Sequence, residues 1–226
     1  VGDEAGTAIT TGDSNVLIGY QTGDAITTGL QNVAVGQAAL SAEDTANYST
    51  AVGHAALFTQ DAGDVDAYNT AVGYKAGLSV TTGTNNTLLG GLAGDALTSS
   101  SRNTALGYGT LSADTLGSHS TAVGNLALVN QNLTTATNVY NTAVGSSAGQ
   151  EITTGTLNTI SGGLAGSALT TGYQNTVYGY GALSTEDTGR LNTAIGTLAL
   201  SSQNSDADNY NTAVGHHAGK AVTTGT

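Results

Sequence analysis

The 226-residue chain contains no proline, cysteine, methionine or tryptophan and only one phenylalanine. The absence of cysteine excludes disulfides and thiolate metal sites. The apolar residues that remain are mostly alanine, valine and leucine, so any interior must be narrow and lined by small side chains. No apolar run approaches the roughly 18 residues that a membrane helix needs, and we expect no membrane contact in this segment.

Basic residues are equally scarce. Lys75, Arg102, Arg190 and Lys220 stand against sixteen acidic residues and leave a formal charge of −12. Such a charge opposes binding to phosphate backbones and to anionic membrane surfaces. The sequence therefore predicts no nucleic-acid partner.

Glycine, by contrast, is abundant, with 33 residues, and thirteen of them recur at nearly fixed intervals. We call these the anchor glycines. Their spacing is 17, 17, 17 and 20 residues, then 17, 17, 17 and 21, then 17, 17, 17 and 19. The residue four places after each anchor follows the order Gly, Gly, Leu, Leu without a slip, so a short unit lies inside a four-unit superrepeat of about 71 residues. The anchors are Gly2, Gly19, Gly36, Gly53, Gly73, Gly90, Gly107, Gly124, Gly145, Gly162, Gly179, Gly196 and Gly215.

The fixed period predicts a single repetitive segment, 1–226, in which each unit contacts only its neighbours. Its superrepeats are 1–71, 72–143 and 144–213, followed by a partial one at 214–226. Because the pattern begins and ends within a superrepeat, we expect a section of a longer array.

A unit of 17 residues is too short for two helices and is rich in glycine, threonine, valine and asparagine, which favour strands and turns. The sequence therefore predicts an all-β fold, a parallel β-solenoid or β-roll of about 13 coils of 17–21 residues. In one unit, 69–72 is the expected first strand, Gly73 the turn, 76–80 a shorter second strand, and 81–83 the return. Equivalent residues would then stack about 4.8 Å apart. Stacked amides are expected to form a ladder at Asn69, Asn86, Asn103, Asn141, Asn158, Asn175, Asn192 and Asn211.

The two residues before each anchor are apolar in almost every unit, as at Ala71 and Val72. Neighbouring strand residues point to opposite faces, so this pattern is typical of a parallel sheet covered on both sides. It predicts lateral association between copies of the chain. A lone solenoid is the alternative, because the outward residues are small and alternate with threonine.

The phrases NTAVGYKAG, STAVGHAAL, NTAIGTLAL and NTAVGHHAG resemble the NSVAIG-type repeats in the YadA-like head of trimeric autotransporter adhesins, and related repeats of phage tail fibres. The resemblance implies a left-handed parallel β-roll, three chains around an axis, and an extracellular adhesive fibre on a cell surface or virion, with a host or surface receptor as partner. Two features depart from the family: the asparagine lies one residue closer to the glycine, and the coils are longer.

The fourth coil of each superrepeat is the long one, with added residues in 58–68, 129–140 and 201–210. Insertions in a solenoid project as loops, which could serve as contact loops or be tolerated bulges. The candidate contact residues are Tyr68, Tyr140, Tyr210, Asp64, Asp66, Asp206 and Asp208. Together with Asp61, these acids could collect Ca²⁺, but 133–140 has no acid, and solvated charge is the simpler interpretation. We expect no other cofactor.

Catalytic arrangements are not evident. His54 and His216 are nine coils apart, roughly 43 Å, and the acid pairs Glu43/Asp44 and Glu186/Asp187 are interpreted as turn residues rather than a glycosidase pair. We expect no enzyme, but a structural or adhesive segment of an extracellular fibre. A phage tail-fibre shaft is one alternative. An ice-binding solenoid is another, because threonine recurs one residue after each ladder position, at 70, 87 and 104 among others.

Overall fold

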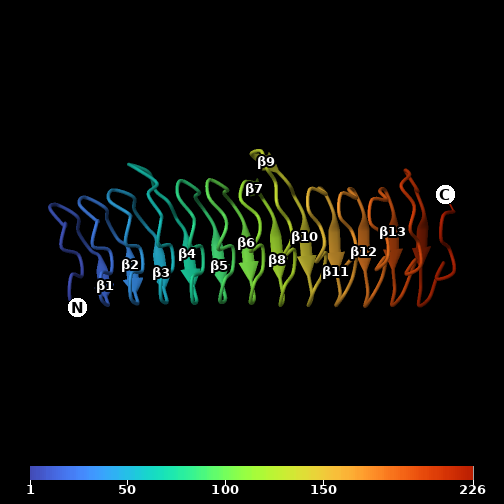
Figure 1. Ribbon diagram of the computed structural model, residues 1–226, viewed down its shortest axis with the longest axis horizontal. Helices are drawn as coiled ribbons and strands as arrows, with labels where there is room; N and C mark the ends of the chain where they lie inside the picture. Colours follow the sequence, from blue (N-terminus) through green and yellow to red (C-terminus); the bar gives the residue numbers. More distant parts are fainter. Residues whose placement is uncertain (226) are drawn as a thin grey trace.

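The computed structural model describes residues 1–225 and shows an elongated stack of coils (Figure 1). Twelve short strands form one parallel sheet in chain order, and two further strands pair with each other. The predicted all-β parallel solenoid is thereby confirmed. No helix long and apolar enough to cross a membrane occurs within residues 1–225.

Each strand of the main sheet ends at the residue before an anchor glycine. Every strand residue is paired with its equivalent in the next coil, as in Thr70 with Thr87. The strands are β1 (Val16–Ile18), β2 (Val33–Val35), β3 (Thr50–Val52), β4 (Thr70–Val72), β5 (Thr87–Leu89), β6 (Thr104–Leu106), β8 (Thr121–Val123), β10 (Thr142–Val144), β11 (Thr159–Ser161), β12 (Thr176–Tyr178), β13 (Thr193–Ile195) and β14 (Thr212–Val214); the separate pair is β7 (Gly117–Ser118) and β9 (Thr137–Asn138). The coil around Gly2 forms no strand, although the Gly19 N–H still donates to the Val1 carbonyl at 2.8 Å.

The predicted second strand at 76–80 is wrong. This segment is a series of turns, in which the N–H of Ala76 donates to the Gly73 carbonyl and that of Val80 to the Gly77 carbonyl. The cause is local backbone geometry: Lys75 has φ of 54° and Gly77 of 61°. A strand requires negative φ throughout, so the left-handed Gly77 within 76–80 prevents one, and Lys75 already turns the chain just before it.

Only glycine fits at the anchor positions, because the backbone has a positive φ there and a side chain would have no room. Gly73 has φ of +142°, and a Cβ added there would lie 2.4 Å from the carbonyl oxygen of Gly90. Close approach of successive coils at this turn therefore excludes any side chain. Gly90 meets Gly107 in the same way, at 2.3 Å.

The Gly, Gly, Leu, Leu order is a packing pattern of the core. At Gly94 an added Cβ would lie 2.6 Å from Leu97 and 2.9 Å from Leu88, two large buried side chains. In the next coil a buried leucine, Leu111, occupies the glycine's place, and the strand supplies only Ala105. Large and small residues thus alternate so that the interior stays filled.

Candidate functional site

The outer face of the main sheet carries an exposed apolar rank. The middle residue of each strand points inward, as at the fully buried Ala71, whereas the third residue points outward. We call these third residues the outer apolar rank. Exposed members are Ile18, Val72, Leu89, Val144, Tyr178 and Val214, which are 36–67% exposed. The single chain therefore covers only one of the two apolar faces.

Charge is segregated away from this face. From residue 5 onward, no acidic residue lies within four positions of any anchor glycine, so fourteen of the sixteen acids lie elsewhere in the coils; the other two are Asp3 and Glu4. The residues that could carry positive charge in these windows are His54, Lys75, His216 and His217. Two such faces could approach each other with little repulsion despite the net charge of −12.

The predicted asparagines lie inside the coils as a mixed ladder. The backbone N–H of Asn86 donates to the side-chain oxygen of Asn69 at 2.9 Å, and the Asn86 Nδ2 donates across the coil to the Ser100 carbonyl at 2.9 Å. The same two bonds recur at Asn103. Direct amide-to-amide bonds occur at three described steps, Asn69 to Asn86, Asn158 to Asn175 and Asn175 to Asn192, at 3.1–3.2 Å. The Nδ2 groups of all the ladder asparagines except Asn192 also donate to a carbonyl across their own coil. The backbone N–H and the Nδ2 of Asn192 donate only to Asn175, and its own side-chain oxygen has no partner within residues 1–225.

The added residues of the long coils pair back onto the preceding coil. β9 pairs with β7 in the second superrepeat, and single bridges join Asn47 to Asp66 in the first and Arg190 to Asp208 in the third. The three insertions therefore share one geometry, although their sequences differ. In Figure 1 they lie at the upper edge of the stack, away from the turns that follow the strand ends.

Three buried carboxylates support these insertions, and sequence reasoning missed their role. Glu43 is fully buried: its Oε1 accepts the N–H of Ala46 at 2.8 Å, and its Oε2 accepts the Gln60 amide at 2.9 Å. Asp114 with Gln131 and Glu186 with Gln203 repeat the arrangement. Glu43 and Glu186 lie beside bends at 44–45 and 187–188, as expected of turn residues, but their burial was not anticipated: their carboxylates replace solvent with buried N–H donors.

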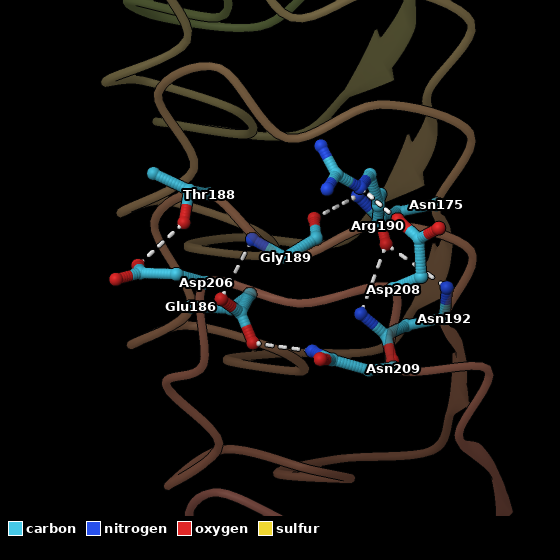
Figure 2. Close-up of polar contacts among 9 residues, drawn as sticks. All are labelled: Asn175, Glu186, Thr188, Gly189, Arg190, Asn192, Asp206, Asp208 and Asn209. Carbon is cyan, nitrogen blue, oxygen red and sulfur yellow. Dashed lines mark hydrogen bonds and ion pairs between the residues drawn. The ribbon is translucent and has the colours of Figure 1, made fainter. Parts of the chain in front are cut away.

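Figure 2 shows polar contacts around Glu186 in the third superrepeat, together with surface residues of the same region. Glu186 points toward the Gly189 N–H at 2.8 Å and the Asn209 amide at 3.1 Å, while Asp206 accepts the Thr188 hydroxyl at 2.7 Å. Arg190 forms an ion pair with Asp208 on the surface. Asp206 and Asp208 are thus engaged by protein donors.

The acids of the first long coil do not gather as one calcium set. Asp66 accepts the Asn47 amide and the Tyr68 hydroxyl, and Asp64 is exposed. Within residues 1–225, Asp61 instead approaches Glu43 and Asp44, with one carboxylate oxygen of each within 4.8 Å of the others. The equivalent residues of the second superrepeat are Asp114, Thr115 and Asn132, and there Thr115 donates to Asn132 at 3.2 Å. This acidic group is therefore particular to the first superrepeat.

The tyrosines that end the insertions lie on the surface, and two of the three lie next to another ring. Tyr68 stacks on Tyr48 with ring centroids 5.1 Å apart, and Tyr140 lies beside His119 at 5.0 Å. Burial of the hydroxyl and the neighbouring Asp66 carboxylate raise the pKa of Tyr68. Tyr210 is 67% exposed. These rings form a broken aromatic row rather than a pocket.

The histidines are spread along the stack. His54 stacks on Tyr74, with centroids 5.4 Å apart, and His216 stacks on His217 at 3.8 Å. Burial, His216 and Lys220 lower the pKa of His217. None of the four histidines of the chain belongs to the acidic group of Glu43, Asp44 and Asp61.

The chain matches no protein-family model, no curated protein and no solved structure. The surfaces described above are therefore the basis for a functional proposal.

Proposed function

We propose that this chain is a non-enzymatic structural and adhesive segment of an extracellular fibre, on a cell surface or a virion, and that copies associate laterally through the outer apolar rank. The observation that carries the proposal is the acid-free outer face of the twelve-stranded sheet, where the outer apolar rank is exposed at six strands, half-buried at five and interrupted by Ser161 at the remaining one. The resemblance to YadA-like head repeats supports the extracellular setting and a homotrimer as the form of association.

A fibre must resist stretching along its axis, and the backbone bonds of this fold run in that direction. The Thr70 N–H donates to the Asn86 carbonyl and the Gly90 N–H to the Val72 carbonyl, both at 2.8 Å. These bonds recur from coil to coil and lie in parallel ladders. Extension would have to break several of them at once in one coil.

The size of the apolar face is compatible with stable association. Twelve strands about 4.8 Å apart give a strip roughly 50 Å long and 10 Å wide. With the turn residues that precede each strand, this approaches the roughly 800 Å² per partner of a stable interface. Burying the strip in a trimer or bundle would remove the outer apolar rank from water.

Mass per unit length measured by electron microscopy tests association. We expect about three chains per coil rise for a homotrimer, and a value of one would contradict lateral association. The variant Val72→Asp/Val144→Asp should reduce the value to one, because it places two charges on the apolar face. The matched control is Val65→Asp, at an exposed position in a long coil, which should leave the value unchanged.

The absence of catalytic activity is also part of the proposal. In the acid pairs, Glu43 and Glu186 are buried and accept bonds from backbone and glutamine donors. A glycosidase needs two carboxylates facing the substrate, so these pairs do not suit hydrolysis. Incubation with surface polysaccharides should release no reducing ends, and glycan cleavage would contradict this part.

The threonine rank favours a second candidate, ice binding. The first strand residues from Thr70 to Thr212 are in register on the exposed face, next to the outer apolar rank. Thermal hysteresis distinguishes this candidate from the fibre. A phage tail-fibre shaft is the virion form of the fibre proposal and shares its mechanics.

A further inference from the structure

Exposed tyrosines follow several anchor glycines directly. Tyr20, Tyr74, Tyr108 and Tyr180 occupy the same place in their coils and are 44–57% exposed. The strands run toward the lower edge of the stack in Figure 1, so the turns that carry these rings line that edge, while the long coils lie at the upper one. The tyrosines thus belong to a surface separate from the insertions.

Two of these tyrosines have a seat built by glycine. A Cβ added at Gly91 would lie 3.5 Å from Cδ2 and 3.9 Å from Cε2 of Tyr108, so one side of the ring lies over the backbone of the preceding coil. At the next position, Gly109 leaves room for Leu126, whose Cδ2 would lie 2.9 Å from an added Cβ. The Tyr108 ring thus lies close to the backbone at Gly91 on one side and remains 56% exposed.

The third superrepeat contains the same arrangement. An added Cβ at Gly163 would lie 3.5 Å and 3.9 Å from Cδ2 and Cε2 of Tyr180, and one at Gly181 would lie 2.9 Å from Leu198. We call the two sets, Tyr108 with Leu126 and Tyr180 with Leu198, the tyrosine seats. They lie four coils apart, about 19 Å along the axis.

The chemistry around the seats is apolar and uncharged. Asn125 and Thr197 follow them at the equivalent place in the next coil and offer polar side chains. The anchor windows of these coils, 103–111, 120–128, 175–183 and 192–200, contain no acidic or basic residue. An exposed ring beside hydrogen-bonding side chains suits a ligand with an apolar face and polar edges. The charge of −12 on the chain opposes an anionic polymer.

We propose that the tyrosine seats bind an uncharged polysaccharide that lies along the edge of the solenoid. A sugar ring presents C–H groups on its faces and hydroxyls on its rim, which matches the exposed tyrosine ring and the polar residues beside it. The rise per coil, about 4.8 Å, is close to the length of one sugar in an extended chain. This inference rests on the proposed fibre function and supplies the ligand of its adhesive role.

Two equivalent seats on one rigid rod favour a polymer over a small ligand. A chain that reaches both seats binds the second one intramolecularly, so its affinity exceeds that of either seat alone. The alternative partner of the tyrosine seats is a second copy of this protein, because its own seats have the same spacing. The experiment separates these two occupants.

The test is retention of the wild-type chain on particles of cellulose, chitin and neutral β-glucan, with Tyr108→Ala/Tyr180→Ala as the variant. The matched control is Tyr140→Ala/Tyr210→Ala, which removes two exposed tyrosines from the long coils. We expect wild-type retention on at least one polysaccharide, at least a tenfold loss of affinity in the variant, and a change of less than twofold in the control. Each single seat variant should lose less than the double variant.

Mass per unit length is measured on the same samples, and circular dichroism shows that each variant is folded. The proposal is supported if the Tyr108→Ala/Tyr180→Ala variant loses retention on the polysaccharide while its mass per unit length is unchanged. Retention of the variant at the wild-type level overturns it, as does wild-type failure on all three polysaccharides while filaments are intact. Loss of lateral assembly in the seat variant also overturns it, because the seats would then be contacts between chains. Wild-type chains that form no assembly contradict the fibre proposal instead.

Discussion

Left-handed backbone at residues other than glycine is a recurring local cost of this coil. Such residues occupy three places in the unit, as at Tyr68, Lys75 and Leu111, with φ of 48–54°. The left-handed conformation costs roughly 1–2 kcal/mol for a residue with a Cβ. At Leu111 this cost is offset by complete burial of the side chain. At exposed positions nothing comparable offsets it.

Replacing an exposed left-handed residue by glycine should therefore stabilise the fold. Gln174 has φ of 57°, is exposed, and keeps its N–H bond to the Thr156 carbonyl whatever its side chain. We expect Gln174→Gly to raise the free energy of unfolding by about 0.5–1 kcal/mol, because relief of strain exceeds the added freedom of the unfolded chain. Chemical denaturation measures it. The strand variant Thr176→Gly should be destabilised, and equal effects at both positions would contradict the explanation.

Asp95 makes stability depend on pH. It is partly buried, one of its oxygens has no hydrogen-bond partner among residues 1–225, and desolvation raises its pKa despite Lys75 nearby. The folded state therefore holds the proton more tightly than the unfolded state. Stability from protonated Asp95 is present below the ordinary pKa and is lost as pH rises through the folded-state pKa.

Asp95→Asn should accordingly unfold at a higher temperature than wild type at pH 7, and the two should converge at pH values below the ordinary aspartate range. The comparison is Asp24, the equivalent residue one superrepeat earlier, which accepts the Ser41 hydroxyl at 2.6 Å. Asp24→Asn should give no such gain. A constant difference across pH for the Asp95 variant would refute its titration as the cause.

Within one coil, the size of the residue four places after the anchor must match its neighbours. Gly94→Ala should lower the free energy of unfolding by about 2–4 kcal/mol, from left-handed strain and from overpacking against Leu88 and Leu97. Gly63 is the matched control, because it also has a left-handed φ, +68°, but no atom lies within 4 Å of an added Cβ. Gly63→Ala should cost about 1–2 kcal/mol. Similar losses at both sites in denaturant titrations would mean that core packing is not the cause.

The strand of each coil was predictable from the sequence, whereas the rest of the coil was not. Threonine, alanine and valine before an anchor specify an extended segment that ends at the glycine. After the anchor, the left-handed residue is lysine in one coil and leucine, alanine or histidine in others. No residue type marks that conformation, so 76–80 was expected to be extended.

The buried carboxylates were missed for a different reason. Glu43 is followed by Asp44, and adjacent acids usually lie in solvent. The usable signal was the position of Glu43 in the unit, seven residues after its anchor glycine. In other coils this position is occupied by the buried residues Ile26, Val80 and Leu97. A carboxylate at a position otherwise filled by core residues predicts a buried acid with partners. Gln60, seven residues after the next anchor, was that partner.

At the scale of the whole molecule, coils are not interchangeable. Deleting 73–144 joins Val72 to Gly145 and removes one complete superrepeat, so each remaining side chain keeps an equivalent neighbour. We expect its thermal midpoint to stay within a few degrees of wild type. Deleting only 107–123 removes Asp114 and leaves Gln131 and the following N–H groups without their acceptor, which costs several kcal/mol. Equal midpoints for both deletions would contradict a four-coil unit.

Because the packing pattern of the core repeats only after four coils, the length of the solenoid can change only by whole superrepeats. Growth or shortening by slippage during gene copying would be tolerated in steps of about 19 Å, four rungs at a time, while intermediate lengths would misfold. The spacing between successive insertions on the edge is then preserved by the same constraint. Natural variants of such a solenoid should differ in length by whole superrepeats, and the distance between successive insertions should stay the same.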